Sequence, residues 1–166
     1  MRHARTPGDP APIFFSRLWQ GLALHTQREV DDKVVFAYNP LPSYWGVYIR
    51  EYALAYSFVI TLRILRRISP DGVIEISSGE EPDSVALTIF LKDPKDRNIG
   101  KAIAPYLPIM KSILAELETP STVSLGQGGF ALTYSLPLYR GKETSLCEGD
   151  VDYIELAVEH ALAASL

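Results

Sequence analysis

The chain has 166 residues, of which 47% are hydrophobic and 22% are charged, as expected for one globular domain with its own core. The 16 basic and 20 acidic residues give a formal net charge of −4, which disfavours nucleic acid and anionic lipid as partners. A single cysteine excludes an internal disulfide and a cysteine-based metal cluster. The longest apolar run, residues 52–62, is about half of the ~20 residues that cross a bilayer, and the N-terminus shows no export signal. We therefore expect a cytoplasmic protein without membrane insertion.

The first elements in chain order are an arm, a short helix and a strand. Residues 1–12 are rich in proline, charge and small side chains, which predicts a mobile N-terminal arm. Residues 14–27 show apolar side chains at helical spacing and are predicted to form a helix. The face of this helix is formed by Leu18, Leu22 and His25. Residues 33–38 are β-branched and aromatic, and the turn formers after them end a predicted strand.

The longest predicted element is a helix that begins at Ser43 as its N-cap. Apolar residues recur along it on two adjacent faces, so both sides of the helix must be covered. The first face holds Val47, Leu54, Phe58, Leu62 and Leu65, and the second holds Tyr48, Tyr52, Ala55 and Val59. The helix ends at residues 69–72, Ser-Pro-Asp-Gly, because proline disfavours helical geometry in the residue before it and Asp-Gly favours a tight turn.

Two hairpins and two helices complete the chain. The strands 73–78 and 84–92 flank an acidic loop and are expected to pair antiparallel. A further helix is marked by Leu107, Met110, Ile113, Leu114 and Leu117. The strands 122–125 and 130–138 flank a glycine-rich turn, and this turn lacks the lysine and the following helix of a phosphate loop. We expect a final helix over 151–166. The predicted boundaries are 1–12 for the arm, 13–140 for the domain, and 141–166 for a linker and the C-terminal helix.

Three stretches in this order resemble the ATP-binding domain of sensor histidine kinases. The long helix runs into ITLRILRRISPDG, the next strands read GVIEISS and SVALTIFLKD, and the later helix and hairpin read LPIMKSILAELETPSTVSLGQGGFALTYSLPL. The resemblance covers residues 33–140 and rests on the order, lengths and turns of the elements together. It implies an α+β fold, a two-layer α/β sandwich in which helices cover a mixed, mostly antiparallel sheet, as in the Bergerat-like ATPases of the GHKL superfamily.

The residues that hold ATP and magnesium in that family are largely replaced in this chain. The resemblance aligns the magnesium-binding asparagine with Ile64, which has no oxygen ligand. It aligns the adenine-binding aspartate with Asp93, but Pro94 follows where the family has spaced glycines. The glycine-rich stretch that wraps the phosphates aligns with a segment in which Pro105 has no N–H and Tyr106 would fill the phosphate space.

The helical turn before the aligned asparagine carries Ser57 and Ile60, so no metal site can be assembled there. We therefore expect no cofactor and no metal, with Asp93 as a vestige of the adenine contact. Two groups of side chains are instead candidates for contact with a protein partner. Aromatic residues are enriched at interfaces, which selects Trp45 and Tyr48 near the predicted helix start. The second group is the basic cluster of Arg63, Arg66 and Arg67, although such a cluster at a helix end also favours the helix dipole.

These patterns lead to a functional hypothesis and two alternatives. The first is a non-catalytic ATPase-like signalling or regulatory module, a pseudokinase type, that acts through protein contacts in a two-component pathway. Its partner would be a response regulator, a kinase or an assembly subunit, and an oligomer is compatible with it. The second is an enzyme, either a divergent ATP-binding histidine kinase that uses Asp93 or a histidine phosphotransferase with His25 as acceptor. The third is a structural subunit of a larger assembly.

Overall fold

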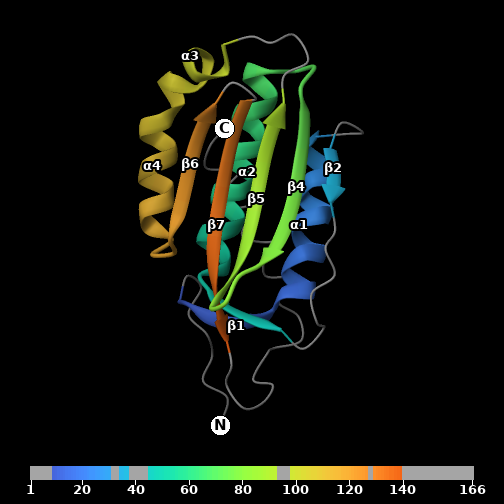
Figure 1. Cartoon of the computed structure of the whole chain (residues 1–166), viewed down its shortest axis with the longest axis vertical. Coiled ribbons are helices and arrows are strands. Elements are labelled where there is room, and N and C mark those ends of the chain that lie inside the picture. The colour runs from blue at the N-terminus through green and yellow to red at the C-terminus, as the bar shows by residue number, and fades with distance from the viewer. Residues whose placement is uncertain (1–8, 31–33, 38–44, 93–97, 127–128, 140–166) are drawn as a thin grey trace.

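A computed structural model describes residues 9–30, 34–37, 45–92, 98–126 and 129–139. Within them, seven strands form one sheet in the order β1-β3-β7-β5-β4-β2, with β6 paired to β7. The pair β2–β4 is parallel and the other pairs are antiparallel. Helices α1 and α2 lie behind the sheet, and α4 lies beside β6 (Figure 1). This arrangement confirms the predicted α+β two-layer sandwich with a mixed, mostly antiparallel sheet.

The elements have the following bounds in chain order. They are β1 (Ala11–Phe14), α1 (Phe15–Val30), β2 (Val34–Ala37), β3 (Gly46–Ile49), α2 (Glu51–Ile68), β4 (Val73–Glu80), β5 (Ser84–Lys92), α3 (Ile99–Ile103), the 3₁₀ turn η2 (Ala104–Tyr106), α4 (Leu107–Glu116), β6 (Ser121–Gly126) and β7 (Gly129–Tyr139).

The long helix starts later than the sequence analysis predicted. Helix α2 begins at Glu51, and Arg50 before it has extended backbone geometry and forms no side-chain cap. Val47 and Tyr48, which were placed on the helix, belong to strand β3. The apolar spacing that suggested one continuous helix is therefore shared by a strand and a helix that follow each other directly. The predicted N-cap, Ser43, lies outside the described residues.

Strand β1 is a second correction, because its residues had been divided between the arm and the first helix. Ala11 and Pro12 pair with Ile49 and Tyr48 of β3. Helix α1 starts only at Phe15, whose N–H donates to the carbonyl of Trp45 at 2.9 Å. A strand of four residues that contains proline shows too little alternation to be recognised by its period.

The two hairpins form as predicted, and their side chains alternate between a buried and an outer face. All buried positions of β5, namely Val85, Leu87, Ile89 and Leu91, have an exposed fraction of 0%. Gly129 closes the second hairpin with a φ of 135°, a conformation that residues with a Cβ rarely adopt. A Cβ at this position would also overlap the carbonyl oxygen of Leu91. The glycine is required by the turn, which agrees with the hairpin interpretation of this segment.

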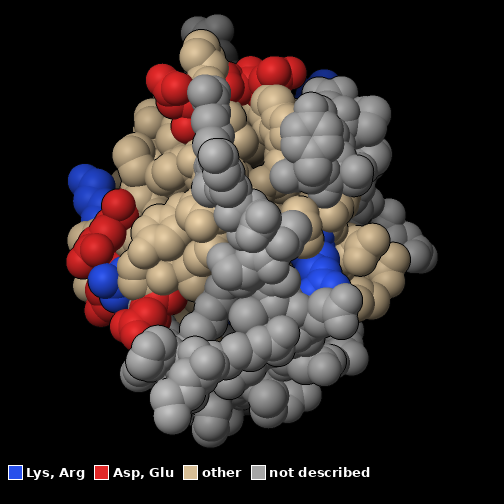
Figure 2. Space-filling model, turned by 90° about the horizontal axis from the view of Figure 1, so that it is seen from below, with Lys and Arg blue, Asp and Glu red and all other residues tan. Residues whose placement is uncertain are grey.

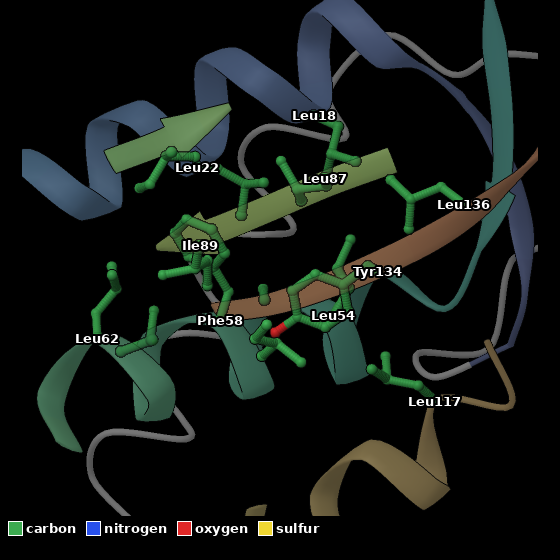
Figure 3. Packing of buried hydrophobic residues seen from close by; sticks show 14 of the residues in the cluster. Leu18, Leu22, Leu54, Phe58, Leu62, Leu87, Ile89, Leu117, Tyr134 and Leu136 are labelled. Atoms are coloured by element: carbon green, nitrogen blue, oxygen red, sulfur yellow. The ribbon is translucent and has the colours of Figure 1, made fainter. Parts of the chain in front are cut away.

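The core lies between the sheet and the helices. Figure 3 shows Leu18 and Leu22 of α1 and Phe58 of α2 packed toward Leu87 and Ile89 of β5. The predicted faces of both helices are therefore buried, and α2 is covered on most of its circumference, as its two apolar faces required. Each fully buried side chain of this size contributes about 1.5–3 kcal/mol.

The later helix also forms where it was predicted. Helix α4 starts at Leu107 with a proline in its first turn, where a missing N–H costs no helical hydrogen bond. Met110 is its buried residue, and Leu117 caps its C-terminal end. The predicted C-terminal helix over 151–166 lies outside the described residues.

Acidic side chains lie at the end of the molecule where β4 turns into β5. Figure 2 views this end and shows Asp and Glu side chains gathered on it in groups. The β4–β5 turn contributes the exposed residues Glu80, Glu81 and Asp83. This end differs from the outer face of the sheet, which is described below.

Candidate functional site

The region that corresponds to a nucleotide site is bounded by α2 on one side and by α3 and α4 on the other. Helices α3 and α4 both contact α2. Ile64 of α2 is 8% exposed and belongs to the same buried cluster as Ile99, Ile103 and Met110. Tyr106 packs against this cluster from the 3₁₀ turn. Apolar side chains thus occupy the space between these helices.

The backbone before α4 has few N–H groups to offer a phosphate. The N–H of Ala102 donates to the carbonyl of Asn98 at 3.2 Å, and that of Lys101 donates to the Asn98 side-chain oxygen at 3.1 Å. The N–H groups of Ala104 and Leu107 also donate within the helical turns. Pro105 has no N–H. A phosphate-binding stretch needs free N–H groups that point at the ligand, whereas four N–H groups of this segment donate to Asn98 or within the helical turns.

A small polar network lies two turns before Ile64, on the same face of α2, because residues 57, 61 and 64 follow helical i, i+4, i+7 spacing. The hydroxyls of Ser57 and Tyr134 are 2.9 Å apart, and both residues are buried. Ser57 donates its single proton to the carbonyl of Leu54 at 2.9 Å, so Tyr134 is the donor toward Ser57. Thr61 donates to the carbonyl of Ser57 at 2.7 Å. In Figure 3 the hydroxyl oxygen of Tyr134 is directed toward α2.

Tyr134 is held in its neutral form. Burial strongly raises the pKa of its phenol, and the influence of the neighbouring Ser57 and Thr61 on this pKa is smaller. A neutral phenol that donates one hydrogen bond within a hydrophobic core fixes the register between β7 and α2. The network is therefore a structural feature and not a catalytic group.

The residues predicted from the family resemblance are partly described. Asp93 and Pro94 lie outside the described residues, so the adenine contact stays a prediction. Ile60 packs against the core from α2, and Pro105 is exposed. Within the described part of the chain, no three His, Cys, Asp or Glu side chains are placed to hold a metal ion.

The two predicted aromatic contact residues lie in and before β3 and not on a helix. Trp45 is half-buried and packs against the core, whereas Tyr48 is 44% exposed. Tyr48 stacks on Tyr139 of β7, with ring centroids 6.4 Å apart and an interplanar angle of 21°. Sequence reasoning missed this pair because the partners are far apart in the chain and β3 was assigned to a helix.

The basic cluster lies on the last two turns of α2. Arg66 donates to the carbonyl of Pro70 at 3.0 Å and so stabilises the turn after the helix. Arg63 is half-buried and has an interaction of its own, and Arg67 is exposed. Of the three, Arg67 is the side chain best placed to meet a partner.

His25, the candidate phosphate acceptor, is 4% exposed on the inner side of α1. A phosphoryl donor could not reach it unless α1 moved away from the sheet. None of the helices in the described part of the chain is long and apolar enough to cross a membrane.

The fold matches solved structures of histidine kinases. The Acinetobacter baumannii histidine kinase AdeS matches with a TM-score of 0.57 and 16% identity, over 78% of this chain and 67% of that one. The histidine kinase domain of the E. coli osmosensor EnvZ matches with a TM-score of 0.58 and 14% identity, over 89% and 99% of the two chains. The chain has the histidine-kinase ATPase fold.

A further match is ShkA, solved at full length in complex with AMPPNP, with a TM-score of 0.53 and 15% identity. This match covers 84% of this chain and 33% of that one. No protein-family model matches the sequence, and no curated protein matches it. Identities this low define the shared fold, and function has to be argued from the residues of this chain.

Proposed function

We propose that this chain is a non-catalytic ATPase-like signalling or regulatory module that acts through protein contacts. The observation that carries the proposal is the contact of α3 and α4 with α2, together with the burial of Ile64, Ile99, Ile103 and Met110 in the one hydrophobic core. A nucleotide would have to displace these side chains and would find no oxygen ligand at Ile64 for its magnesium.

The backbone N–H groups before α4 that already donate to acceptors within the protein support the same proposal independently. A phosphate group gains most of its binding energy from unpaired N–H donors and positive charge. Here Lys101 is exposed, but its N–H and that of Ala102 are occupied by Asn98. Opening this turn would cost its helical hydrogen bonds before a phosphate bond could form.

The proposed target of the module is a partner protein in a two-component pathway. This partner is a response regulator, a kinase or a subunit of an assembly. The exposed Tyr48, which stacks on the half-buried Tyr139, and the exposed Arg67 on a separate element are side chains of the kinds enriched at protein interfaces. We place the module in the cytoplasm, where these partners act.

Thermal unfolding with and without AMPPNP and magnesium tests the proposal. A ligand that binds the folded state at 100 times its Kd stabilises it by about 2.7 kcal/mol, which raises the Tm by roughly 5–11 °C for a chain of this size. We expect no such rise. ShkA, which was solved with AMPPNP, provides the positive control under the same conditions.

The variant Asp93→Asn distinguishes the proposed non-catalytic module from the enzyme alternative, in which Asp93 binds the nucleotide. A saturable rise of the wild-type Tm that Asp93→Asn abolishes would contradict the proposal and support a divergent nucleotide-binding domain. If AMPPNP leaves both proteins unchanged while ShkA responds, the nucleotide function is excluded and the partner function remains.

A further inference from the structure

The outer face of the sheet, which points away from α1 and α2, has no charged side chain over its central strands. Side chains that alternate with the buried ones on β5, β6 and β7 form this face, and cross-strand pairing brings them into rows. Six of them form its centre, namely Ala86, Thr88, Phe90, Thr122, Ala131 and Thr133. The hydroxyls of Thr88 and Thr133 lie 3.1 Å apart within one row.

This neutrality is unusual for a surface in contact with water. A soluble small domain is designed with about 25–35% of Lys, Arg, Glu and Asp on its surface. Here residues 119–139 contain no Asp, Glu, Lys or Arg, although the whole chain is 22% charged. Glu75 of β4 and Lys92 at the end of β5 mark the border of the neutral area. Figure 1 views this face, and the described helices α1 and α2 lie behind it.

The sequence beyond β7 contains a segment whose pattern fits such a face. Residues 151–166 carry apolar side chains at helical spacing, which predicts one amphipathic helix. Its apolar side is formed by Ile154, Ala157, Val158, Ala161 and Leu162. The carboxylates of Asp152, Glu155 and Glu159 recur at i, i+3 and i+7, on the opposite side. A helix with one apolar side needs a surface that covers it.

We propose that the C-terminal segment 151–166 docks as a helix on the outer face of β5, β7 and β6 and turns the two-layer sandwich into a three-layer one. Charge permits this occupant, because the neutral face does not repel its carboxylates, which remain on the solvent side. Small side chains on both surfaces, such as Ala157 and Ala161 against Ala131 and Thr133, allow close approach of helix and sheet.

The length of the intervening chain permits this return. Strand β7 ends at Tyr139, and its 11 residues extend over about 37 Å. Residues 140–150 can reach over about 36–40 Å when extended, and a helix of 16 residues is about 24 Å long. The helix can therefore lie along the sheet anywhere between the two ends of β7. The stacked rings of Tyr48 and Tyr139 flank the point where the linker leaves the strand.

Paramagnetic relaxation in the full-length chain tests the docking. In a Cys147→Ser background, a nitroxide is attached at Glu159→Cys, on the predicted solvent side of the helix. We expect methyl signals of Ala131 and Thr133 to broaden when the label is oxidised, while those of Leu18 and Leu22 behind the sheet stay sharp. The spectrum with the reduced label reports whether the fold is intact.

Two matched substitutions control the test. Ala157→Glu places a charge on the apolar side of the helix and should restore the sharp signals of Ala131 and Thr133. Ala163→Glu places the same charge on the opposite side and should leave the broadening unchanged. Both variants keep the described domain untouched, so a loss of folding cannot mimic the result.

A mixed sample identifies the source of any broadening. Isotope-labelled protein without nitroxide is mixed with unlabelled protein that carries it. Broadening in the mixed sample would assign the face to a second copy and overturn docking within one chain. Sharp signals of Ala131 and Thr133 in the chain that carries the nitroxide would also overturn the proposal. So would a broadening that Ala157→Glu and Ala163→Glu change to the same extent.

Discussion

The two faces of strand β7 differ in burial and in chemistry, although their residues alternate along one segment. On the inner face Phe130, Leu132, Tyr134 and Leu136 are all fully buried under the helices. On the outer face Ala131 and Thr133 are small and half-buried. The inner face holds the fold together, whereas the outer face is the one to which we assign the docking of residues 151–166. Substitutions of the same kind on the two faces should therefore have different effects.

Phenylalanine offers the largest contrast between the faces. Phe58→Ala removes a fully buried ring of α2 and should lower the free energy of unfolding by about 3–5 kcal/mol. Phe90→Ala, on the outer face of β5, should cost about 1–2 kcal/mol because its ring is already half-exposed. Urea unfolding followed by circular dichroism measures both. Equal losses would contradict the assignment of the core to the inner face.

The next largest loss of stability should follow from substitutions in the buried hydroxyl pair of Ser57 and Tyr134. Tyr134→Phe removes the donor to Ser57 and should destabilise the chain by about 1–2 kcal/mol. Combining it with Ser57→Ala in a double-mutant cycle should give a loss smaller than the sum of the single losses, because both changes remove one interaction. Strict additivity would show that the two hydroxyls do not interact in solution.

The pH dependence of stability checks the same group without changing its neighbours. Because burial raises the pKa of Tyr134, the unfolded chain ionises above about pH 10 while the folded chain keeps the proton. The unfolded state then binds fewer protons, so stability falls with rising pH by up to ~1.4 kcal/mol per unit. The difference in unfolding free energy between wild type and Tyr134→Phe should shrink above pH 10. A constant difference would place the phenol in contact with water.

The outer hydroxyl pair should show the smallest effect. Thr88→Val keeps the shape of the side chain and removes its hydrogen bond with Thr133, a bond between two part-buried neutral hydroxyls. We expect a change within about 0.5–1 kcal/mol in urea unfolding. A loss as large as that of Tyr134→Phe would contradict the difference between the two faces.

Much of this architecture could be predicted from the sequence. Apolar periods in α1 and α2, alternation in the two hairpins, and the turn chemistry of Ser69 to Gly72 are local signals, and the structure confirms them. The ordered series of elements was sufficient to identify the histidine-kinase ATPase fold, which the solved structures share.

The features that the sequence analysis did not predict share one physical origin, because they depend on contacts between residues far apart in the sequence. Strands β1 and β3 are four residues each, and only their mutual pairing and the contact of β3 with β7 stabilise them as strands. No local period marks them, so Tyr48 was placed on a helix and its stacking with Tyr139 went unnoticed. The contacts of α3 and α4 with α2, through which Ile103 and Met110 join the same buried core as Ile64, likewise depend on tertiary packing.

The packed space between α2 and α4 is the central claim of this account, and a methyl-resolved NMR titration with ATP and magnesium tests it most directly. The methyl signals of Ile64, Ile103 and Met110 report on that space. We expect them to stay in place throughout the titration, because no nucleotide enters between the helices. Saturable shifts of these three signals, with the rest of the spectrum unchanged, would show that the site opens and would contradict the account.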